Sequence, residues 1–259
     1  MNEFLRTCLL VCPLVFLAGF VDSVAGGGGI ISIPAYLIAG VPTYQALGTN
    51  KLVNMIGTGA SSVRYFRGGK VILKIALPAA AGSLAGSLLG TNLALLIPER
   101  ILKLVLLVLL PVIALFLIRQ KSFGAEEGET GDFEPRRTVL LALLIGLGIG
   151  LYDGLIGPGT GTFFIMAFTA VFRTDLLRSS GCAKIANLSS NIMSAVVYMM
   201  AGKIWYLLAI PAVIFNVAGN LTGTRYALKG GSKNVRKVMF LVLGLLFVRV
   251  ILELTGAVG

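Results

Sequence analysis

The stretch GFVDSVAGGGG at residues 19–29 decides how this chain is organised. It places Asp22 and four consecutive glycines between two apolar segments, residues 5–21 and 30–39. Each glycine in a helix interior costs about 1 kcal/mol relative to alanine, so four in succession predict a break between helices. In lipid, unwound backbone is tolerated only where protein or a watery cavity satisfies its polar groups. The stretch therefore predicts a polar site inside an apolar bundle.

The composition indicates that the solvent around this bundle is lipid. Of the 259 residues, 56% are hydrophobic and 13% are charged, and the mean hydropathy is +0.92. Soluble domains carry roughly 45–50% apolar and about 25% charged residues. The pattern predicts an all-α polytopic membrane protein of about eight to ten hydrophobic segments: 5–21, 30–39, 44–66, 71–97, 101–118, 138–152, 162–172, 176–201, 205–228 and 235–254. Segments 30–39 and 162–172 are too short to cross a bilayer, so they are either half-helices that turn back or parts of broken spans.

The opening pattern returns in the second half of the chain as GLYDGLIGPGTG at residues 150–161. Asp22 corresponds to Asp153 at an offset of 131 residues, and Lys51 corresponds to Lys184 at an offset of 133. We therefore divide the chain into a first repeat (1–119), a connecting loop (120–137) and a second repeat (138–259). Each repeat has an odd net number of crossings, so the two repeats are expected to be inverted. Inverted repeats are common in secondary transporters, where the site lies near the bilayer midplane at the repeat interface.

The net charge of +11 comes from 22 Lys and Arg against 11 Asp and Glu. A basic chain can bind nucleic acid. Here most of the Lys and Arg residues fall in loops on one side of the predicted spans, which favours the positive-inside pattern of a multi-pass protein. We expect lipid and no nucleic acid as partner, a cytoplasmic central loop, and both termini outside the cytoplasmic (inner) membrane.

Lys51 and Lys184 are predicted to lie deep inside the membrane. Thr43 and Thr174 are the expected N-caps of the helices that carry them. Lys51 follows Thr43 by eight residues, about 12 Å along a helix axis, in a hydrocarbon core of about 30 Å. A lysine at such depth needs a partner or a function. Two interpretations stay open and can both hold: a structural ion pair, for example of Lys51 with Asp22 or Asp153, and a site for a small oxyanion.

Side-chain amides and backbone N–H groups extend the predicted anion site. Asn54 and Asn187 lie three residues after the lysines on the same helical face. Each break leaves free N–H groups at the start of the next half-helix, and such groups favour an anion. The predicted substrate-binding residues are Lys51, Lys184, Asn54, Asn187, Gly26, Gly27, Gly28, Gly29, Gly157, Gly159, Gly161 and Asn50. Asp22 and Asp153 are expected to be counter-ions or proton carriers.

Several function classes have no support in the sequence. The chain has no histidine and no P-loop, and its three cysteines lack metal-ligand spacing. We therefore expect no enzyme activity, no metal and no cofactor. An anion channel and a membrane assembly subunit without transport remain as alternatives to a transporter. A small-residue face with Gly82, Gly86 and Gly90 could serve internal packing or a homodimer.

The chain resembles the TauE/SafE family of sulfite and organosulfonate permeases. The resemblance rests on GFVDSVAGGGG at 19–29, ALGTNKL at 46–52, GLYDGLIGPGTG at 150–161 and AKIAN at 183–187. It runs through both repeats and implies a bacterial cytoplasmic-membrane permease for sulfur-containing oxyanions. Two departures, Pro158 and Thr160 in the second break, make the two half-sites unequal. The sequence thus predicts a secondary transporter of a small anion that works by alternating access.

Overall fold

The computed structural model describes residues 3–106, 108 and 134–254, with side chains from residue 4 to residue 238, and in this part of the chain the regular elements are all helices. They are α1 (Glu3–Ala25), α2 (Gly29–Ile38), α3 (Thr43–Arg67), α4 (Leu73–Leu96), α6 (Pro135–Leu155), α7 (Thr160–Phe172), α8 (Leu176–Met200) and α9 (Tyr206–Leu254). The all-α prediction is confirmed. Most of the predicted segment 101–118 and of the loop 120–137 lies outside the described residues, and the three-part division stays a prediction.

Four of the described helices are long and apolar enough to cross a membrane: residues Phe4–Ala25, Leu73–Leu96, Pro135–Leu155 and Tyr206–Val238. Their outer faces expose large apolar side chains such as Leu77 (58%) and Ile210 (65%). Water would not tolerate so wide an apolar surface, whereas lipid tails do. Helices α3 and α8 carry more polar residues, but these are largely buried inside the bundle. The molecule is therefore a membrane protein with a polar centre.

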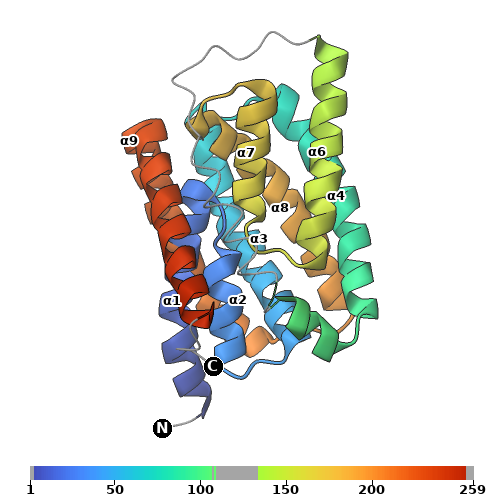
Figure 1. Cartoon of the computed structure of the whole chain (residues 1–259), viewed down its shortest axis with the longest axis vertical. Coiled ribbons are helices and arrows are strands. Elements are labelled where there is room, and N and C mark those ends of the chain that lie inside the picture. Colours follow the sequence, from blue (N-terminus) through green and yellow to red (C-terminus); the bar gives the residue numbers. More distant parts are fainter. Residues whose placement is uncertain (1–2, 107, 109–133, 255–259) are drawn as a thin grey trace.

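Both predicted breaks are present. Helix α1 ends at Ala25 and α2 begins at Gly29, while α6 ends at Leu155 and α7 begins at Thr160. In Figure 1, α2 runs down to the end where α1 begins, and α7 runs up to the opposite end, where α6 begins. The two short helices, of 10 and 13 residues, are thus half-helices that turn back. Their N-termini meet in the middle of the molecule.

Helices from the first half of the chain pack against helices from the second half in matching pairs. Helix α1 packs along α9, α6 packs along α4, and α3 packs against α8. A Cβ on Gly219 of α9 would lie 2.1 Å from the carbonyl oxygen of Phe16 in α1. The corresponding Cβ on Gly86 of α4 would lie 2.2 Å from that of Leu147 in α6. These pairs match at the offsets of 133 and 131 residues, which is compatible with inverted repeats.

The glycines of α4 pack inside the chain. Gly82, Gly86 and Gly90 all face carbonyl groups of α6, at 2.1–2.2 Å from a Cβ placed on each. Of the two roles expected for this small-residue face, the structure supports internal packing. The homodimer stays a prediction, and these glycines give it no surface.

The helix caps differ from the prediction. Asp175, and not Thr174, caps α8, because its carboxylate accepts hydrogen bonds from the N–H groups of Leu177 and Arg178. Thr43 is the first residue of α3, and its N–H donates to Glu99 Oε1 at 2.5 Å. At both helix starts a carboxylate accepts the backbone hydrogen bonds in place of a threonine hydroxyl, because its negative charge also interacts favourably with the positive end of the helix dipole.

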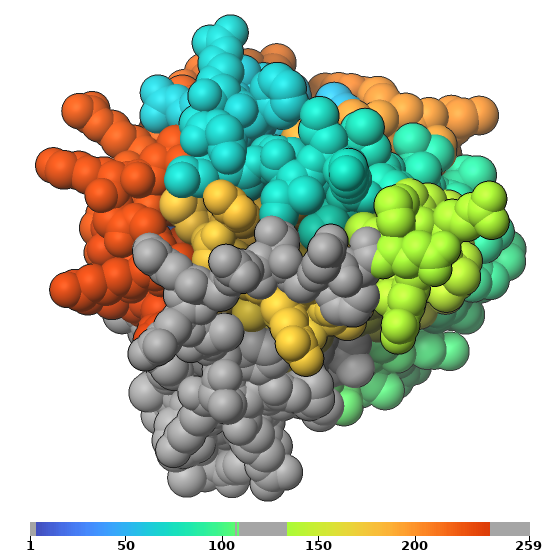
Figure 2. Space-filling view, turned by 90° about the horizontal axis from the view of Figure 1, so that it is seen from above, coloured from blue at the N-terminus to red at the C-terminus, as the bar shows by residue number. Residues whose placement is uncertain are grey.

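One end of the molecule collects the basic residues. The last turn of α3 carries Arg64 and Arg67, the start of α6 carries Arg136 and Arg137, and α9 turns at Gly231 in the middle of a basic segment. Figure 2 looks onto this end. Helix α1 begins at the opposite end, and the last part of α9 runs down from the basic end towards it (Figure 1).

Candidate functional site

Two buried ion pairs join the repeats at the centre of the molecule. Lys184 Nζ of α8 donates to Asp22 Oδ2 of α1 at 2.8 Å. Lys51 Nζ of α3 lies 2.6 Å from Asp153 Oδ2 of α6. The four side chains are between 0% and 8% exposed. Each lysine is thus paired with the aspartate from the other half of the chain, and the four charges sum to zero.

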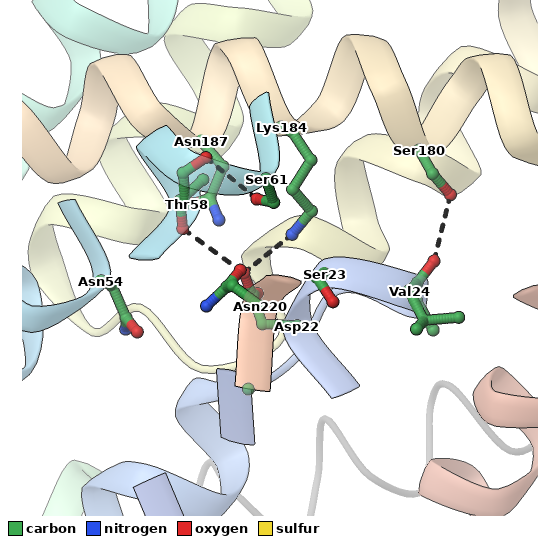
Figure 3. A network of polar contacts seen from close by, with 12 residues as sticks. Asp22, Ser23, Val24, Asn54, Thr58, Ser61, Ser180, Lys184, Asn187 and Asn220 are labelled. Atoms are coloured by element: carbon green, nitrogen blue, oxygen red, sulfur yellow. Dashed lines mark hydrogen bonds and ion pairs between the residues drawn. The ribbon is translucent and has the colours of Figure 1, made fainter. Parts of the chain in front are cut away.

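The two pairs differ in their hydrogen bonds. Asp22 Oδ2 also lies 3.4 Å from the Thr58 hydroxyl, and Figure 3 shows Thr58 and Lys184 converging on this carboxylate. Apart from its 2.6 Å contact with Lys51 Nζ, Asp153 Oδ2 has no hydrogen-bond partner among the described residues. Asp153 is held instead through Oδ1, which accepts from the Thr160 hydroxyl at 2.7 Å. Each carboxylate thus has one threonine hydroxyl beside it, on Oδ2 in Asp22 and on Oδ1 in Asp153.

The helix breaks touch each other beside these pairs. Gly26 has φ +74°, and a Cβ on it would lie 2.2 Å from the backbone of Gly161 and Thr162. Only glycine fits this crossing, both for its left-handed conformation and for the missing side chain. The Thr162 hydroxyl donates to the carbonyl of Ala25 at 3.0 Å and ties the two breaks together.

Further hydrogen bonds hold the carbonyl groups in the last turn of α1, just before the break. The Tyr65 hydroxyl donates to the Ser23 carbonyl at 2.8 Å. The Ser180 hydroxyl lies 3.3 Å from the Val24 carbonyl, the contact at the right of Figure 3. Helix ends and breaks in a membrane need such partners because lipid offers none. The break is consequently a fixed part of the fold.

A small cavity lies between the pairs and the breaks. Its volume is about 20 Å³, which is room for about one water molecule. Both half-helices begin at it, since Gly29 of α2 and Thr160 of α7 are in its wall. The lining residues are Asp22, Gly27, Gly29, Asn50, Lys51, Asn54, Asp153, Gly157, Gly159, Thr160, Gly161, Asn187 and Asn191.

Most of the predicted site residues meet at this cavity. Gly26 and Gly28 do not line it: Gly26 packs on Gly161, and a Cβ on Gly28 would lie 2.4 Å from the Ala18 carbonyl oxygen. Lys184 reaches the wall through its bond to Asp22. The ion-pair interpretation is thus present in the structure, while anion binding at these residues stays a prediction.

The sequence prediction missed Thr160 as a partner of Asp153 and Asn191 as a wall residue. The signal for Thr160 was its place within a run of glycines, where a polar side chain can reach the aspartate that begins the motif. Asn191 corresponds to Thr58 at the offset of 133, so the repeat alignment could have found it.

Comparison with known proteins agrees with this architecture. The family model described as Sulfite exporter TauE/SafE matches residues 11–250. The chain belongs to the TauE/SafE family. Among its relatives, "Probable membrane transporter protein ORF9" from a Sinorhizobium species is 37% identical and covers 93% of this chain and 90% of its own length. "Probable membrane transporter protein YfcA" of Escherichia coli K12 is 30% identical, with coverages of 98% and 94%.

The TauE/SafE match spans both repeats and all the site residues named above. A third relative, "Probable membrane transporter protein" of Haemophilus influenzae, is 30% identical over 88% of each chain. No solved structure matches this chain. The family and the names of these relatives indicate a membrane transporter.

Proposed function

We propose that this protein is a secondary transporter that carries a small anion, a sulfur-containing oxyanion such as sulfite or an organosulfonate, by alternating access. The observation that carries the proposal is the pair of buried lysines at a cavity where two half-helices begin. Lysine charge and helix N-termini both stabilise anions. A lysine at this depth in a membrane is costly, which favours a functional role beside its ion pair.

The anion binds by exchange with an aspartate. A cavity of about 20 Å³ holds about one water, so an oxyanion enters only when a lysine–aspartate pair separates and the walls move. Lys51 or Lys184 then exchanges its carboxylate partner for the anion.

Proton coupling follows from charge neutrality. The closed site is neutral, so an added anion would leave a net negative charge in a low-dielectric interior, which is unfavourable. Protonation of Asp22 or Asp153 removes that charge. The two aspartates are therefore the proton carriers of the proposed cycle, and a monovalent anion moves with one proton.

Alternating access follows from the way the pairs link the repeats. Each pair joins one helix of the first repeat to one helix of the second. The half-helices α2 and α7 leave the cavity toward opposite ends (Figure 1). Opening on the α2 side or on the α7 side gives the two access states. By the positive-inside rule, the end with the basic residues faces the cytoplasm and the termini face outward across the cytoplasmic membrane.

The test is flux in liposomes. Wild-type protein is expected to accumulate methanesulfonate or sulfite against its gradient when a proton gradient is imposed, whereas purely dissipative flux would indicate a channel. Lys51→Gln and Lys184→Gln are expected to lose most of this uptake. Lys203→Gln, at a half-exposed lysine over the Tyr44 ring, is the matched control and should keep it. Undiminished uptake by both site variants would overturn the assignment of the lysines.

A further inference from the structure

A line of four asparagines leads from α9 through α3 to the cavity wall. Asn220 Nδ2 donates to Asn216 Oδ1 at 2.9 Å, and Asn216 Nδ2 donates to Asn54 Oδ1 at 3.2 Å. Asn54 Nδ2 in turn donates to Asn50 Oδ1 at 3.2 Å. We name these four residues the asparagine relay. Asn54 and Asn50 line the cavity, whereas Asn216 and Asn220 lie behind them and are fully buried.

The direction of the asparagine relay is set at its far end. Asn220 Nδ2 also donates to the backbone carbonyl of Asn216 at 3.1 Å. A carbonyl can only accept, so this bond fixes which end of the Asn220 amide carries the nitrogen. Every following amide then accepts on its oxygen and donates with its nitrogen. Hydrogen bonds in such a chain also polarise and strengthen one another.

The direction determines what Asn50 offers to the cavity. Its Oδ1 is occupied twice, by Asn54 and by the Ser32 hydroxyl at 2.7 Å. The amide nitrogen of Asn50, with its two N–H donors, is therefore the polar group left for a ligand. In the described part of the chain this nitrogen donates no hydrogen bond.

The asparagine relay belongs to one repeat interface only. At the offset of 133 residues, Asn216 and Asn220 correspond to Ser83 and Ser87, and Asn50 corresponds to Ala183. The space for the relay comes from Gly57 of α3, where a Cβ would lie 1.8 Å from Asn216 Oδ1. The matching residue of the other half is Ser190. Where one half has a glycine and two asparagines, the other half has three serines at the corresponding positions.

We propose that the asparagine relay is a specificity device, in which Asn216 and Asn220 are positioning residues that fix Asn50 as a hydrogen-bond donor to an oxygen of the transported anion. This inference rests on the proposed transport of an oxyanion. It adds a directed donor to the two lysines, which supply charge without direction. It also makes the two halves of the site unequal in ligand contacts.

The test replaces relay residues by those of the other half and measures methanesulfonate uptake in liposomes. Asn216→Ser and Asn220→Ser let the amides of Asn54 and Asn50 turn. Both are expected to raise KM about tenfold, the size of one hydrogen bond to a charged group, with kcat within about twofold. Asn50→Ala, which removes the donor itself, should give the same rise. Ser83→Ala and Ser87→Ala are the matched controls and should keep the wild-type KM.

The outcomes separate the relay from transport itself. Unchanged KM in Asn50→Ala overturns the relay, even if a buried variant such as Asn216→Ser fails to fold. Equal loss of kcat in all relay variants with unchanged KM also overturns it, because that is the signature of a structural role. If wild-type protein takes up no oxyanion, the proposed function fails, and the relay fails with it.

Discussion

Asp22→Asn tests whether the buried pair with Lys184 is as strongly coupled as its burial implies. Lys184 is 0% exposed and its ammonium lies 2.8 Å from the carboxylate. Removing one partner of a buried pair leaves an uncompensated charge and costs about 3–5 kcal/mol. At about 2–4 °C per kcal/mol for a chain of this size, the apparent melting temperature should fall by about 6–20 °C.

The assay is thermal unfolding of purified protein in detergent, with a bulky organic anion such as gluconate as the only buffer anion. Asp22→Asn combined with Lys184→Met removes both charges and should regain at least half of the loss, because neutral replacement of a buried pair is often tolerated. Arg178→Gln is the control. Its pair with Asp175 is 3.5 Å long and its side chain is 47% exposed, so the loss should stay below about 1 kcal/mol.

Two results would refute this reasoning. If Asp22→Asn melts within about 2 °C of wild type, the pair is not a strong link between the repeats. If the double variant is no more stable than the single variant, the loss does not come from the unpaired lysine. In either case the Asp22–Lys184 pair would not be what holds the closed site together.

Three further predictions concern the break, the second aspartate and coupling. Gly26→Ala should prevent folding, seen as loss of a monodisperse peak in size-exclusion chromatography, because its Cβ would lie 2.2 Å from backbone; Gly148→Ala, with nothing within 4 Å, should fold normally. Thr160→Val removes the donor to Asp153 Oδ1 and should lower stability by about 1–3 kcal/mol in thermal unfolding, whereas an unchanged melting curve would contradict the assigned bond. Methanesulfonate uptake should speed up when the substrate side is acidified and should not respond to a clamped membrane potential; a potential-dependent rate would contradict one-to-one movement with a proton.

The sequence predicts the fold class well because lipid imposes few choices. Apolar segments, two glycine breaks and the repeat offset are enough to predict an all-α bundle with half-helices around two lysines. Residue depth along a helix depends only on the rise per residue, so the central position of Lys51 could be predicted even though Thr43 is not the cap.

The sequence leaves Asp22 and Asp153 open as partners of Lys51, because the choice between them depends on how the two halves pack. Local sequence places Asp22 and Lys51 in the same repeat, but the crossing of the breaks at Gly26 and Gly161 brings each lysine to the other repeat's aspartate. The asparagine relay was missed for a related reason. Asn54 and Asn216 are 162 residues apart in the sequence. Neither position shows by itself that the missing side chain of Gly57 leaves room for them to meet.

The most direct test of the central claim is whether an anion replaces the aspartate. Asp22→Asn leaves Lys184 without its carboxylate, so sulfite or methanesulfonate should bind there and restore stability. At a ligand concentration of 100 times Kd, binding adds about 2.7 kcal/mol. We expect a larger thermal shift with anion in Asp22→Asn than in wild type, and a shift no larger than that of wild type in the double variant that also carries Lys184→Met, since only the Lys51 pair is left there. Equal shifts in all three proteins, or none in any, would contradict an anion site at the buried lysines.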